Sequence, residues 1–265
     1  LRFLIFVCTL AFWLAPNPVS STVADPCPSA QPIAEVRKLP VNSQATVRGL
    51  VTVPTGAVTA GKSFAVQDAT GGIYIYRSKG IGQELATGDD LCVTGKLSEY
   101  HGLTELLPAS PAQVARLGAG KPPRPQVIEP GKIGEATEGW LVSVTGPVSR
   151  LGDRRFRVGD AAIFLENQAG ISTAGLMEGC PATVIGLSAA YDGPQIWPRG
   201  QADVIPGECA PVACEPLTIS QIQGRGDASP YDGKTGLGCV TGCVTGVTAD
   251  GFTLQSTEPD VDPLT

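Results

Sequence analysis

Short stretches of alternating apolar and polar residues, each typical of a β-strand, recur three times along this chain. Residues 47–52 (VRGLVT), 144–149 (VTGPVS) and 240–245 (VTGCVT) share the same order of valine, glycine and polar positions. A period of two places successive side chains on opposite faces of a sheet. A pattern that recurs in this way is typical of a repeated structural unit.

A second predicted strand follows each copy after a turn-rich loop, and it begins on phenylalanine each time. These strands are residues 64–68, 156–160 and 252–256. The matching segments further along are 72–76 with 162–166, and 88–102 with 179–193. Each full unit therefore comprises about five short strands over roughly 75 residues, which is enough for one independent core.

Two complete units and the beginning of a third are expected, joined by proline-rich segments. Proline clusters such as residues 121–125 (KPPRP) form stiff spacers, so they mark the boundaries. The predicted parts are a signal peptide at 1–24, module 1 at 33–108, a Pro-rich linker at 109–131, module 2 at 133–206, a linker at 207–218 and an incomplete module 3 at 219–265.

Residues 1–24 have the features of a secretory signal. Arg2 provides the positive end, residues 3–15 form an apolar run, and residues 22–24 (TVA) offer a small residue for cleavage. The apolar run is too short to span about 30 Å of hydrocarbon. We therefore expect a secreted, extracellular protein with no membrane attachment after the signal is cleaved.

The cysteines agree with export, because small extracellular cores are often reinforced by disulfides. Cys27 precedes the first strand of module 1 and Cys92 opens its fourth strand. Cys180 opens the fourth strand of module 2 and Cys209 follows its last strand. We predict the disulfides Cys27–Cys92 and Cys180–Cys209. The pattern leaves open the partners of Cys214, Cys239 and Cys243.

The charge distribution allows an anionic partner only locally. The formal net charge of −6 disfavours a simple polyanion binder. Between residues 114 and 157, however, eight Lys or Arg stand against four acids. The eight are Arg116, Lys121, Arg124, Lys132, Arg150, Arg154, Arg155 and Arg157. A local positive field of this kind can still attract phosphates.

A catalytic constellation is absent from the sequence. His101 is the only histidine, which excludes paired-histidine metal sites and leaves a Ser-His-Asp triad no choice of base. The acids lack the paired spacing of two-metal phosphodiester chemistry, the cysteines lack a C-x-x-C zinc spacing, and there is no phosphate-cradling loop. We assign no catalytic or metal-binding residue and no cofactor to this segment.

Aromatic and basic residues on the predicted strands indicate a binding surface instead. If the apolar positions of module 1 face its core, alternation turns Tyr74 and Tyr76 outward on the third strand, beside Arg77 and Lys79. An aromatic pair flanked by cations is the platform on which an OB-type barrel stacks single-stranded bases. The alternative is that the two tyrosines only cover strand edges or pack on the linker.

Further candidates lie in the second module and at the end of the fourth strand of the first. The remaining candidate nucleic-acid-binding residues are Phe164, Arg150, Arg154, Arg155 and Arg157 in module 2 and Tyr100 and His101 in module 1. Tyr100 corresponds to Tyr191 in the repeat. Exposed tyrosines stack on sugars as well as on bases, so a glycan-binding surface is an alternative.

The end of the chain carries a more specific motif. Residues 219–230 follow the phrase I-x-x-I-Q-G-x-G-x-x-S-P, a V-x-G-x-V-T strand follows at 240–245, and an F-x-L-Q strand at 252–255. The matching residues are Ile219, Ile222, Gln223, Gly224, Gly226, Ser229, Pro230, Val240, Gly242, Val244, Thr245, Phe252, Leu254 and Gln255. This segment resembles the opening of the OB-like domain of bacterial extracellular nucleases. The resemblance implies an accessory role in a secreted nuclease and carries over no catalytic residue.

We therefore predict an all-β chain of tandem small OB-like β-barrels, two complete and the third truncated. The predicted function is that of the non-catalytic OB-fold array of an extracellular nuclease. It would bind DNA, single-stranded and weakly, or position the protein's own downstream catalytic domain, and a divalent metal would belong to that domain. The alternatives are a glycan- or cell-wall-binding β-module array and a structural spacer.

Overall fold

The computed structural model describes residues 25–209, 216–224, 229–232, 238–248 and 251–256. The chain divides into two compact units, residues 1–208 and residues 209–265. The predicted signal peptide at 1–24 lies outside the described residues. In the part of the chain that the structure describes, no helix is both long and apolar enough to cross a membrane.

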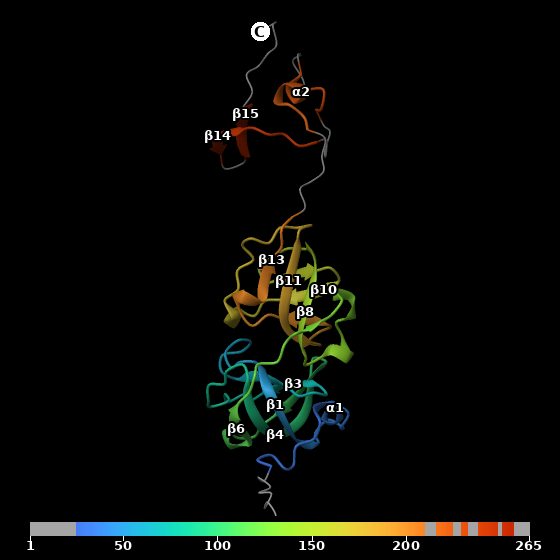
Figure 1. Cartoon of the computed structure of the whole chain (residues 1–265), viewed down its shortest axis with the longest axis vertical. Coiled ribbons are helices and arrows are strands. Elements are labelled where there is room, and N and C mark those ends of the chain that lie inside the picture. The colour runs from blue at the N-terminus through green and yellow to red at the C-terminus, as the bar shows by residue number, and fades with distance from the viewer. Residues whose placement is uncertain (1–24, 210–215, 225–228, 233–237, 249–250, 257–265) are drawn as a thin grey trace, which may run out of the picture. The chain divides into compact units, whose positions relative to one another are not determined.

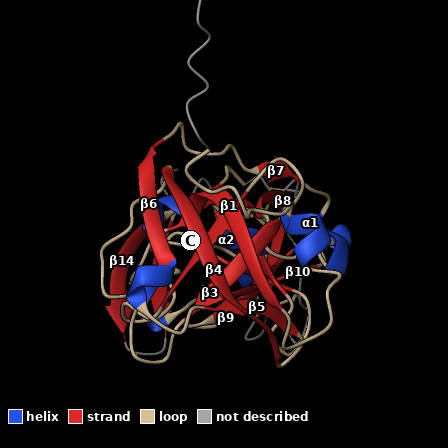
Figure 2. Ribbon diagram, turned by 90° about the horizontal axis from the view of Figure 1, so that it is seen from below, coloured by secondary structure: helices blue, strands red, loops and turns tan. Residues whose placement is uncertain are grey.

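Barrel 1 forms the first half of the first unit. Its elements are α1 (Ile33–Val36), β1 (Gln44–Val53), β2 (Ser63–Gln67), β3 (Gly72–Tyr76), β4 (Asp89–Tyr100), β5 (Leu103–Leu107), a 3-10 turn (Pro111–Gln113) and β6 (Val114–Ala119). The strands follow the order β1-β2-β3-β5-β4, and pairing of β1 with β4 closes the barrel. The β3–β5 pair is parallel. Figure 2 shows β1 and β4 crossing the face turned toward the viewer, with α1 at its edge.

Barrel 2 repeats this arrangement. Its strands are β7 (Gln126–Val127), β8 (Leu141–Ser149), β9 (Arg155–Val158), β10 (Ala161–Phe164), β11 (Pro181–Ala189), β12 (Gln195–Trp197) and β13 (Val204–Pro206). Its 3-10 turns are Pro130–Lys132, Glu135–Thr137, Asn167–Ala169 and Gln201–Asp203. The order β8-β9-β10-β12-β11, closed by β8 on β11, matches that of barrel 1. The predicted tandem of OB-like barrels is confirmed, and Figure 1 shows the two barrels one above the other.

Residues that correspond in the repeat occupy the same structural positions in the two barrels. Phe64 pairs with Ile75 in barrel 1, and Phe156 pairs with Ile163 in barrel 2. All four side chains are buried, as the alternation predicts. The repeat also matches Gly95 of β4 to Gly186 of β11. A Cβ on Gly95 would lie 2.9 Å from Leu106 Cγ of the neighbouring strand, and a Cβ on Gly186 would lie 2.5 Å from the Trp197 carbonyl oxygen. Only glycine fits there without displacing the neighbouring strand.

Much of the segment expected as a linker between the barrels is folded. β6 pairs with β4, from Val114 opposite Val93 to Ala119 opposite Asp89, and β7 pairs with β8. β6 supplies partners for backbone groups of β4 that would otherwise lack them. Barrel 1 therefore extends to Ala119, and the proline cluster at 121–125 lies between β6 and β7.

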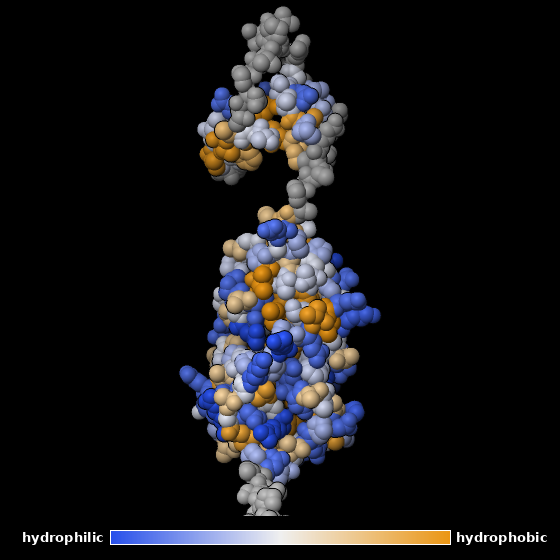
Figure 3. Space-filling view, viewed as in Figure 1, coloured by the Kyte–Doolittle hydropathy of each residue, from blue (hydrophilic) through white to orange (hydrophobic). Residues whose placement is uncertain are grey.

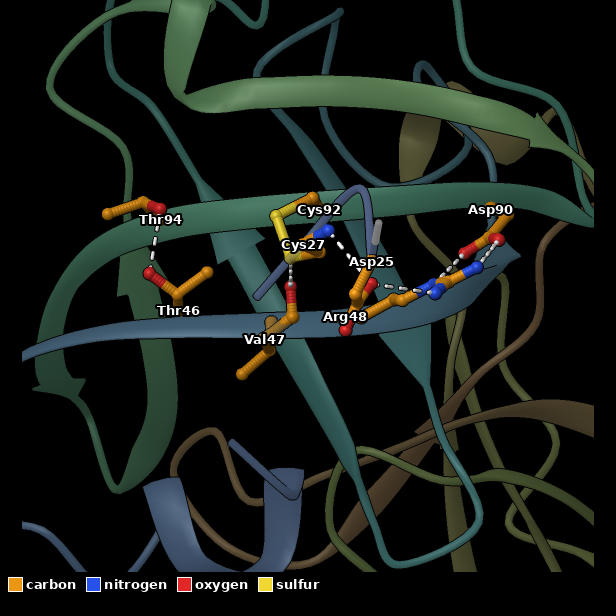
Figure 4. Close-up of a disulfide and its surroundings, with 8 residues drawn as sticks. All are labelled: Asp25, Cys27, Thr46, Val47, Arg48, Asp90, Cys92 and Thr94. Atoms are coloured by element: carbon orange, nitrogen blue, oxygen red, sulfur yellow. Dashed lines mark hydrogen bonds and ion pairs between the residues drawn. A yellow bond between two sulfur atoms is a disulfide. The ribbon is translucent and has the colours of Figure 1, made fainter. Parts of the chain in front are cut away.

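A disulfide ties the N-terminal segment to barrel 1. Cys27 and Cys92 are bonded, with 5.7 Å between their Cα atoms, as predicted. Around them an Arg48–Asp90 ion pair of 2.8 Å and a Thr46–Thr94 hydrogen bond of 2.8 Å join β1 to β4 (Figure 4). The disulfide thus fixes a segment that contributes no strand to the barrel.

Other cysteines are also oxidised. Cys180, Cys209 and Cys239 form disulfides, whereas Cys243 is a free and exposed thiol. The pairing of Cys180 with Cys209 remains a prediction, and Cys214 lies outside the described residues. Disulfides of this kind fit a protein of an oxidising compartment.

The second unit, for which the sequence predicts the beginning of a third module, contains one helix and one hairpin among its described residues. Its helix α2 (Ile219–Gln223) starts in a capping box, in which Thr218 Oγ1 accepts a 3.1 Å hydrogen bond from the Gln221 amide. β14 (Cys243–Thr248) and β15 (Gly251–Gln255) form an antiparallel hairpin. Val247 and Phe252 are 79% and 64% exposed. Within the residues described for this unit, the hairpin has no further strand to complete a barrel.

Candidate functional site

Buried polar contacts lock the two barrels of the first unit together. Glu138, which precedes β8, accepts hydrogen bonds from Arg37 Nη1 and from the Thr104 amide, each at 2.9 Å. From barrel 2, Arg199 donates to the Thr52 carbonyl oxygen at 2.9 Å while two hydrogen bonds hold its guanidinium on Asp203. Because these charges are paired and largely buried, they specify one relative placement of the barrels.

Two glycines allow the backbones of the barrels to touch. A Cβ on Gly72, at the start of β3, would collide with the Gly139 carbonyl, and a Cβ on Gly139 would collide with the Gly72 carbonyl. Gly139 also has a φ of 83°, which disfavours other residues. The close approach of the barrels therefore depends on the absence of side chains at both positions.

A pocket of about 840 Å³ lies where the barrels meet. Barrel 1 contributes residues of β3, the end of β4, β5 and the loop after β1, and barrel 2 contributes residues of β9, β10 and the β11–β12 hairpin. The lining residues are Val58, Thr59, Tyr74, Tyr76, Tyr100, Leu103, Glu105, Arg155, Ala162, Phe164, Glu166, Tyr191, Asp192, Gly193, Pro194, Gln195 and Trp197. In Figure 3 the visible face of this unit carries hydrophobic residues only in small groups among hydrophilic ones.

Aromatic rings from both barrels form one connected wall of the pocket. Tyr74 meets Trp197 edge to face, with 5.8 Å between ring centroids and 77° between planes. Tyr191 lies 5.9 Å from Trp197 and 5.8 Å from Tyr100. Aromatic contacts at these spacings stabilise a fixed arrangement of rings. The wall grades from buried Tyr74 to Tyr100, which is 53% exposed at the outer end.

The outer end of this wall is held by two corresponding hairpin tips. His101 Nδ1 lies 2.8 Å from Asp192 Oδ1, and the Asp192 amide donates to the His101 carbonyl oxygen at 2.9 Å. The His101 ring also stacks on Tyr191, with 4.9 Å between centroids and 17° between planes. Both residues have positive φ, which their turns require. Each tip thereby fixes the other.

Arginines cover the barrel 2 side of the pocket. The guanidinium carbons of Arg154 and Arg155 lie 4.9 and 4.8 Å from the centroid of the Phe164 ring. Arg154 also donates from Nε to the Leu165 carbonyl oxygen at 3.1 Å. Stacking on an aromatic face orients a guanidinium while leaving donors at its edge available.

Three acidic residues, Glu105, Glu166 and Asp192, line the same pocket. Glu105 lies opposite Tyr74 in the parallel register of β3 and β5 and is only 7% exposed. Burial raises the pKa of the Glu105 carboxyl above its usual range. Burial also raises the pKa of Glu166, and the positive charge of Arg154 partly offsets that shift. The pocket thus combines aromatic stacking surfaces with hydrogen-bond acceptors that lie in a largely apolar environment.

The pocket collects five of the eleven residues predicted to bind nucleic acid, and two more adjoin it. Tyr74, Tyr76, Tyr100, Arg155 and Phe164 line it. His101 and Arg154 pack against its lining residues. The remaining residues, which do not line it, are Arg77, Lys79, Arg150 and Arg157.

One expectation about Tyr74 needs correction. Alternation does turn this side chain out of the core of barrel 1, but it is 4% exposed rather than part of an open platform. Its ring is covered by Leu187, Ala189 and Trp197 of barrel 2, which join it in a third apolar cluster. Burial also raises the pKa of its hydroxyl.

Of the four predicted residues that do not line the pocket, two make hydrogen bonds to nearby backbone. Arg77 donates to the Gly80 carbonyl oxygen, and Arg157 donates to the Asp160 carbonyl oxygen. Lys79 and Arg150 are exposed. Four predicted residues are therefore spread over other parts of the surface.

Trp197 and Glu105 are the principal lining residues that the sequence does not single out. Trp197 ends β12, a strand of three residues that is too short to show an alternating pattern. Glu105 lies in the predicted module but carries no motif. Its signal is a lone acid within the apolar stretch 103–107 (LTELL). Among the described residues, no group of three His, Cys, Asp or Glu side chains could hold a metal ion.

Comparisons with known proteins relate part of the chain to a nuclease. No family model matches the chain. It is 34% identical over 142 residues to Endonuclease YhcR of Bacillus subtilis, a match that covers 51% of this chain and 12% of the endonuclease. A crystal structure of fission yeast Pot1 with single-stranded DNA aligns with 68% of this chain and 88% of that one at 12% identity, with a TM-score of 0.29 that is too low to support an argument.

The chain therefore spans only a small part of the endonuclease it matches. The resemblance to a bacterial nuclease that the sequence indicates is nevertheless confirmed, since about half of the chain matches a segment of an endonuclease. The chain thus holds two OB-like barrels, and about half of it is similar to a segment of a bacterial endonuclease.

Proposed function

We propose that the two-barrel unit binds single-stranded DNA as a non-catalytic part of a secreted nuclease. The observation that carries the proposal is the pocket between the barrels, whose wall of tyrosine, tryptophan and phenylalanine rings ends beside stacked arginines. Unpaired bases stack on such rings, and each stacked base contributes about 1–3 kcal/mol. Duplex DNA hides its base faces and could not use this wall.

The arrangement places stacking and phosphate contacts next to each other. A base in the pocket would lie among Tyr76, Tyr100 and Phe164, while the guanidinium of Arg155 is available to an adjoining phosphate. Arg154 lies on the same ring but is partly engaged by the Leu165 carbonyl oxygen and by Glu166. The acidic balance of the chain opposes a polyanion. We therefore expect weak binding that is detectable at low salt and declines near physiological ionic strength.

The role in the larger protein is that of a module that holds the nucleic acid or positions a catalytic domain. This role is supported by the match to a segment of an endonuclease and by the lack of a catalytic constellation in the sequence. Hydrolysis, and any divalent metal it requires, would then belong to a downstream domain. The signal-like residues 1–24 and the disulfides support export of the whole protein.

Glycan binding is the second candidate, and the charge of the pocket favours it. Glu105, Glu166 and Asp192 line the pocket against one cation, Arg155. Carboxylates accept hydrogen bonds from sugar hydroxyls, and Tyr100 and Tyr191 offer faces on which a sugar ring can stack. A cell-wall polysaccharide would satisfy both features.

Fluorescence anisotropy with labelled oligonucleotides at two salt concentrations tests the proposal. Tyr76→Ala and Tyr100→Ala should each weaken binding of single-stranded DNA by about 1–3 kcal/mol. Phe252→Ala, an exposed aromatic outside the pocket, is the matched control and should leave binding unchanged. Failure to bind oligonucleotides at low salt, together with retention on a polysaccharide column, would support the glycan candidate instead.

A further inference from the structure

The acidic side chains inside the pocket indicate which ligand edge it accepts. Glu105 is only 7% exposed, and it faces the pocket from β5. Among the described residues, no hydrogen bond reaches its carboxyl, and its oxygens are not among the side-chain atoms that are sealed from solvent without a partner. The carboxyl is therefore an acceptor that faces the pocket with its bonding capacity free, and a ligand with a donor could use it.

We propose that the pocket selects nucleobases that carry an exocyclic amino group, such as cytosine and adenine, over thymine and uracil. The inference rests on the proposed binding of single-stranded DNA and adds to it the class of base that enters. Glu105 is the principal residue that reads the amino group, and Glu166 is the second acceptor at the same pocket.

The hydrogen-bonding chemistry of the bases supports this selection. An ionised carboxylate only accepts hydrogen bonds. The amino group of cytosine or adenine offers N–H donors, and Glu and Asp accept from the cytosine amine in protein–DNA complexes. Thymine and uracil present carbonyl oxygens at the corresponding position, with a single imide N–H between two of them. A carboxylate would repel these oxygens.

The position of Glu105 relative to the stacking rings fits this reading. Tyr74 and Glu105 are register partners on neighbouring parallel strands, and both line the pocket. Trp197 contacts Tyr74 edge to face. Glu105 and the aromatic wall therefore line the same pocket, so a base that stacks on the exposed rings of the wall has a carboxylate within that pocket.

The same carboxylates exclude phosphate from the interior of the pocket. Arg154 lies 3.8 Å from Glu166 and also covers the face of Phe164, so its charge is partly neutralised on the pocket side. A phosphate inside would meet two carboxylates at close range. We therefore place the sugar–phosphate chain outside the pocket, with one base inserted.

A pair of closely matched oligonucleotides tests the selection. Oligo-5-methyldeoxycytidine and oligo-deoxythymidine of equal length carry the same 5-methyl group. They differ in having an amino group or a carbonyl oxygen at C4, and in the hydrogen that thymine carries at N3. Anisotropy titrations of the full chain at pH 8 and low salt should give at least about tenfold tighter binding of the methylcytidine strand, the ratio expected from one good base-edge contact. This pH keeps cytosine strands from associating through protonated pairs.

Variants of the acids complete the test. Glu105→Gln should reduce the preference to about threefold or less, because an amide can donate to the thymine oxygen as well as accept. Glu166→Gln should reduce it less. The matched control is Glu84→Gln, which is exposed and does not line the pocket, and it should retain the full preference.

The outcomes separate this inference from the proposed function. Equal binding of the two strands, or tighter binding of thymidine, would overturn the selection and leave single-stranded DNA binding intact. An unchanged preference in a folded Glu105→Gln protein would show that Glu105 does not read the amino group. If neither strand bound at low salt, the proposed function itself would be contradicted.

Discussion

His101 and Asp192 occupy corresponding positions in two repeated hairpins and bond to each other, with 2.8 Å between Nδ1 and Oδ1. The residues before them, Tyr100 and Tyr191, are also a repeat pair and lie 5.8 Å apart. The tips of two equivalent elements therefore meet, and Tyr100, Tyr191 and Asp192 of these tips line the pocket. The contact thus fixes one tip of each barrel relative to the other where both contribute to the pocket.

Replacing Gly72 with alanine should separate the two barrels. The new Cβ would collide with the Gly139 carbonyl, and backbone atoms on both sides would have to move. We expect a loss of about 1–3 kcal/mol in the free energy of unfolding of the first unit. Gly118→Ala is the control, since its Cβ would have nothing within 4 Å. Urea titrations followed by tryptophan fluorescence measure both, and equal midpoints for the two variants would contradict the contact.

Removing the Cys27–Cys92 disulfide should destabilise barrel 1 without changing its fold. The bond joins residues 65 apart in sequence, so its loss frees a long loop of the unfolded chain. The double variant Cys27→Ser, Cys92→Ser should lose about 2–4 kcal/mol. Chemical denaturation of the variant against the oxidised wild type gives the difference. Peptide mapping under non-reducing conditions should recover the 27–92 linkage.

Replacing Arg154, Arg155 and Arg157 together should flatten the salt dependence of DNA binding. Each phosphate contact that is lost removes close to one unit of slope from a plot of log affinity against log salt concentration. Arg157 donates to the Asp160 carbonyl oxygen, so we expect most of the change to come from the other two. Single variants, titrated at several salt concentrations, should rank Arg157→Ala as the mildest.

The Glu105 carboxyl should make the stability of the first unit depend on pH. Burial raises its pKa in the folded protein above the ordinary value of 4.5. The folded state therefore binds the proton more tightly than the unfolded state, and its contribution to stability declines as pH rises from about 4.5 through the higher folded pKa. Glu105→Gln should remove this decline.

The difference in stability between Glu105→Gln and the wild type should depend on pH in a defined way. The variant should be more stable than the wild type above that window and show no advantage below about pH 4, where the carboxyl is protonated in both states. Thermal unfolding between about pH 3 and pH 8 measures the difference. Glu84→Gln, an exposed acid outside the pocket, should follow the wild type at every pH. A constant offset at all pH values would indicate a packing effect instead.

The sequence predicts the barrels well because their strands carry local signals. Phe64 and Phe156 begin equivalent strands, and the alternation around them identifies the inward face of each barrel. β6 is missed because the prolines that follow it dominate the composition of the segment, although Val114 and the backbone of β4 make it a strand. Local pattern thus reports which face of a strand turns inward, and proline content misplaces the boundary.

The sequence predicts only part of the site, because contacts between the two barrels produce no periodic pattern in the sequence. Alternation turns Tyr74 out of the core of barrel 1, yet nothing in its neighbourhood shows that Trp197, 123 positions later in the printed sequence, will cover it. Arg155 is found because it lies in the basic segment 150–157, and Phe164 because the repeat matches it to an aromatic position of module 1. Glu105 is a lone acid among apolar residues, and its meaning depends on a pocket that exists only after both barrels have packed.

The meeting of the two hairpin tips has a consequence for any shortened form of this protein. Because the walls of the pocket come from both barrels, neither barrel expressed alone would hold it. A change at the Tyr100–His101 tip would alter contacts of the Tyr191–Asp192 tip, which belongs to the other barrel. One barrel alone would keep its strands and its core and lose the pocket.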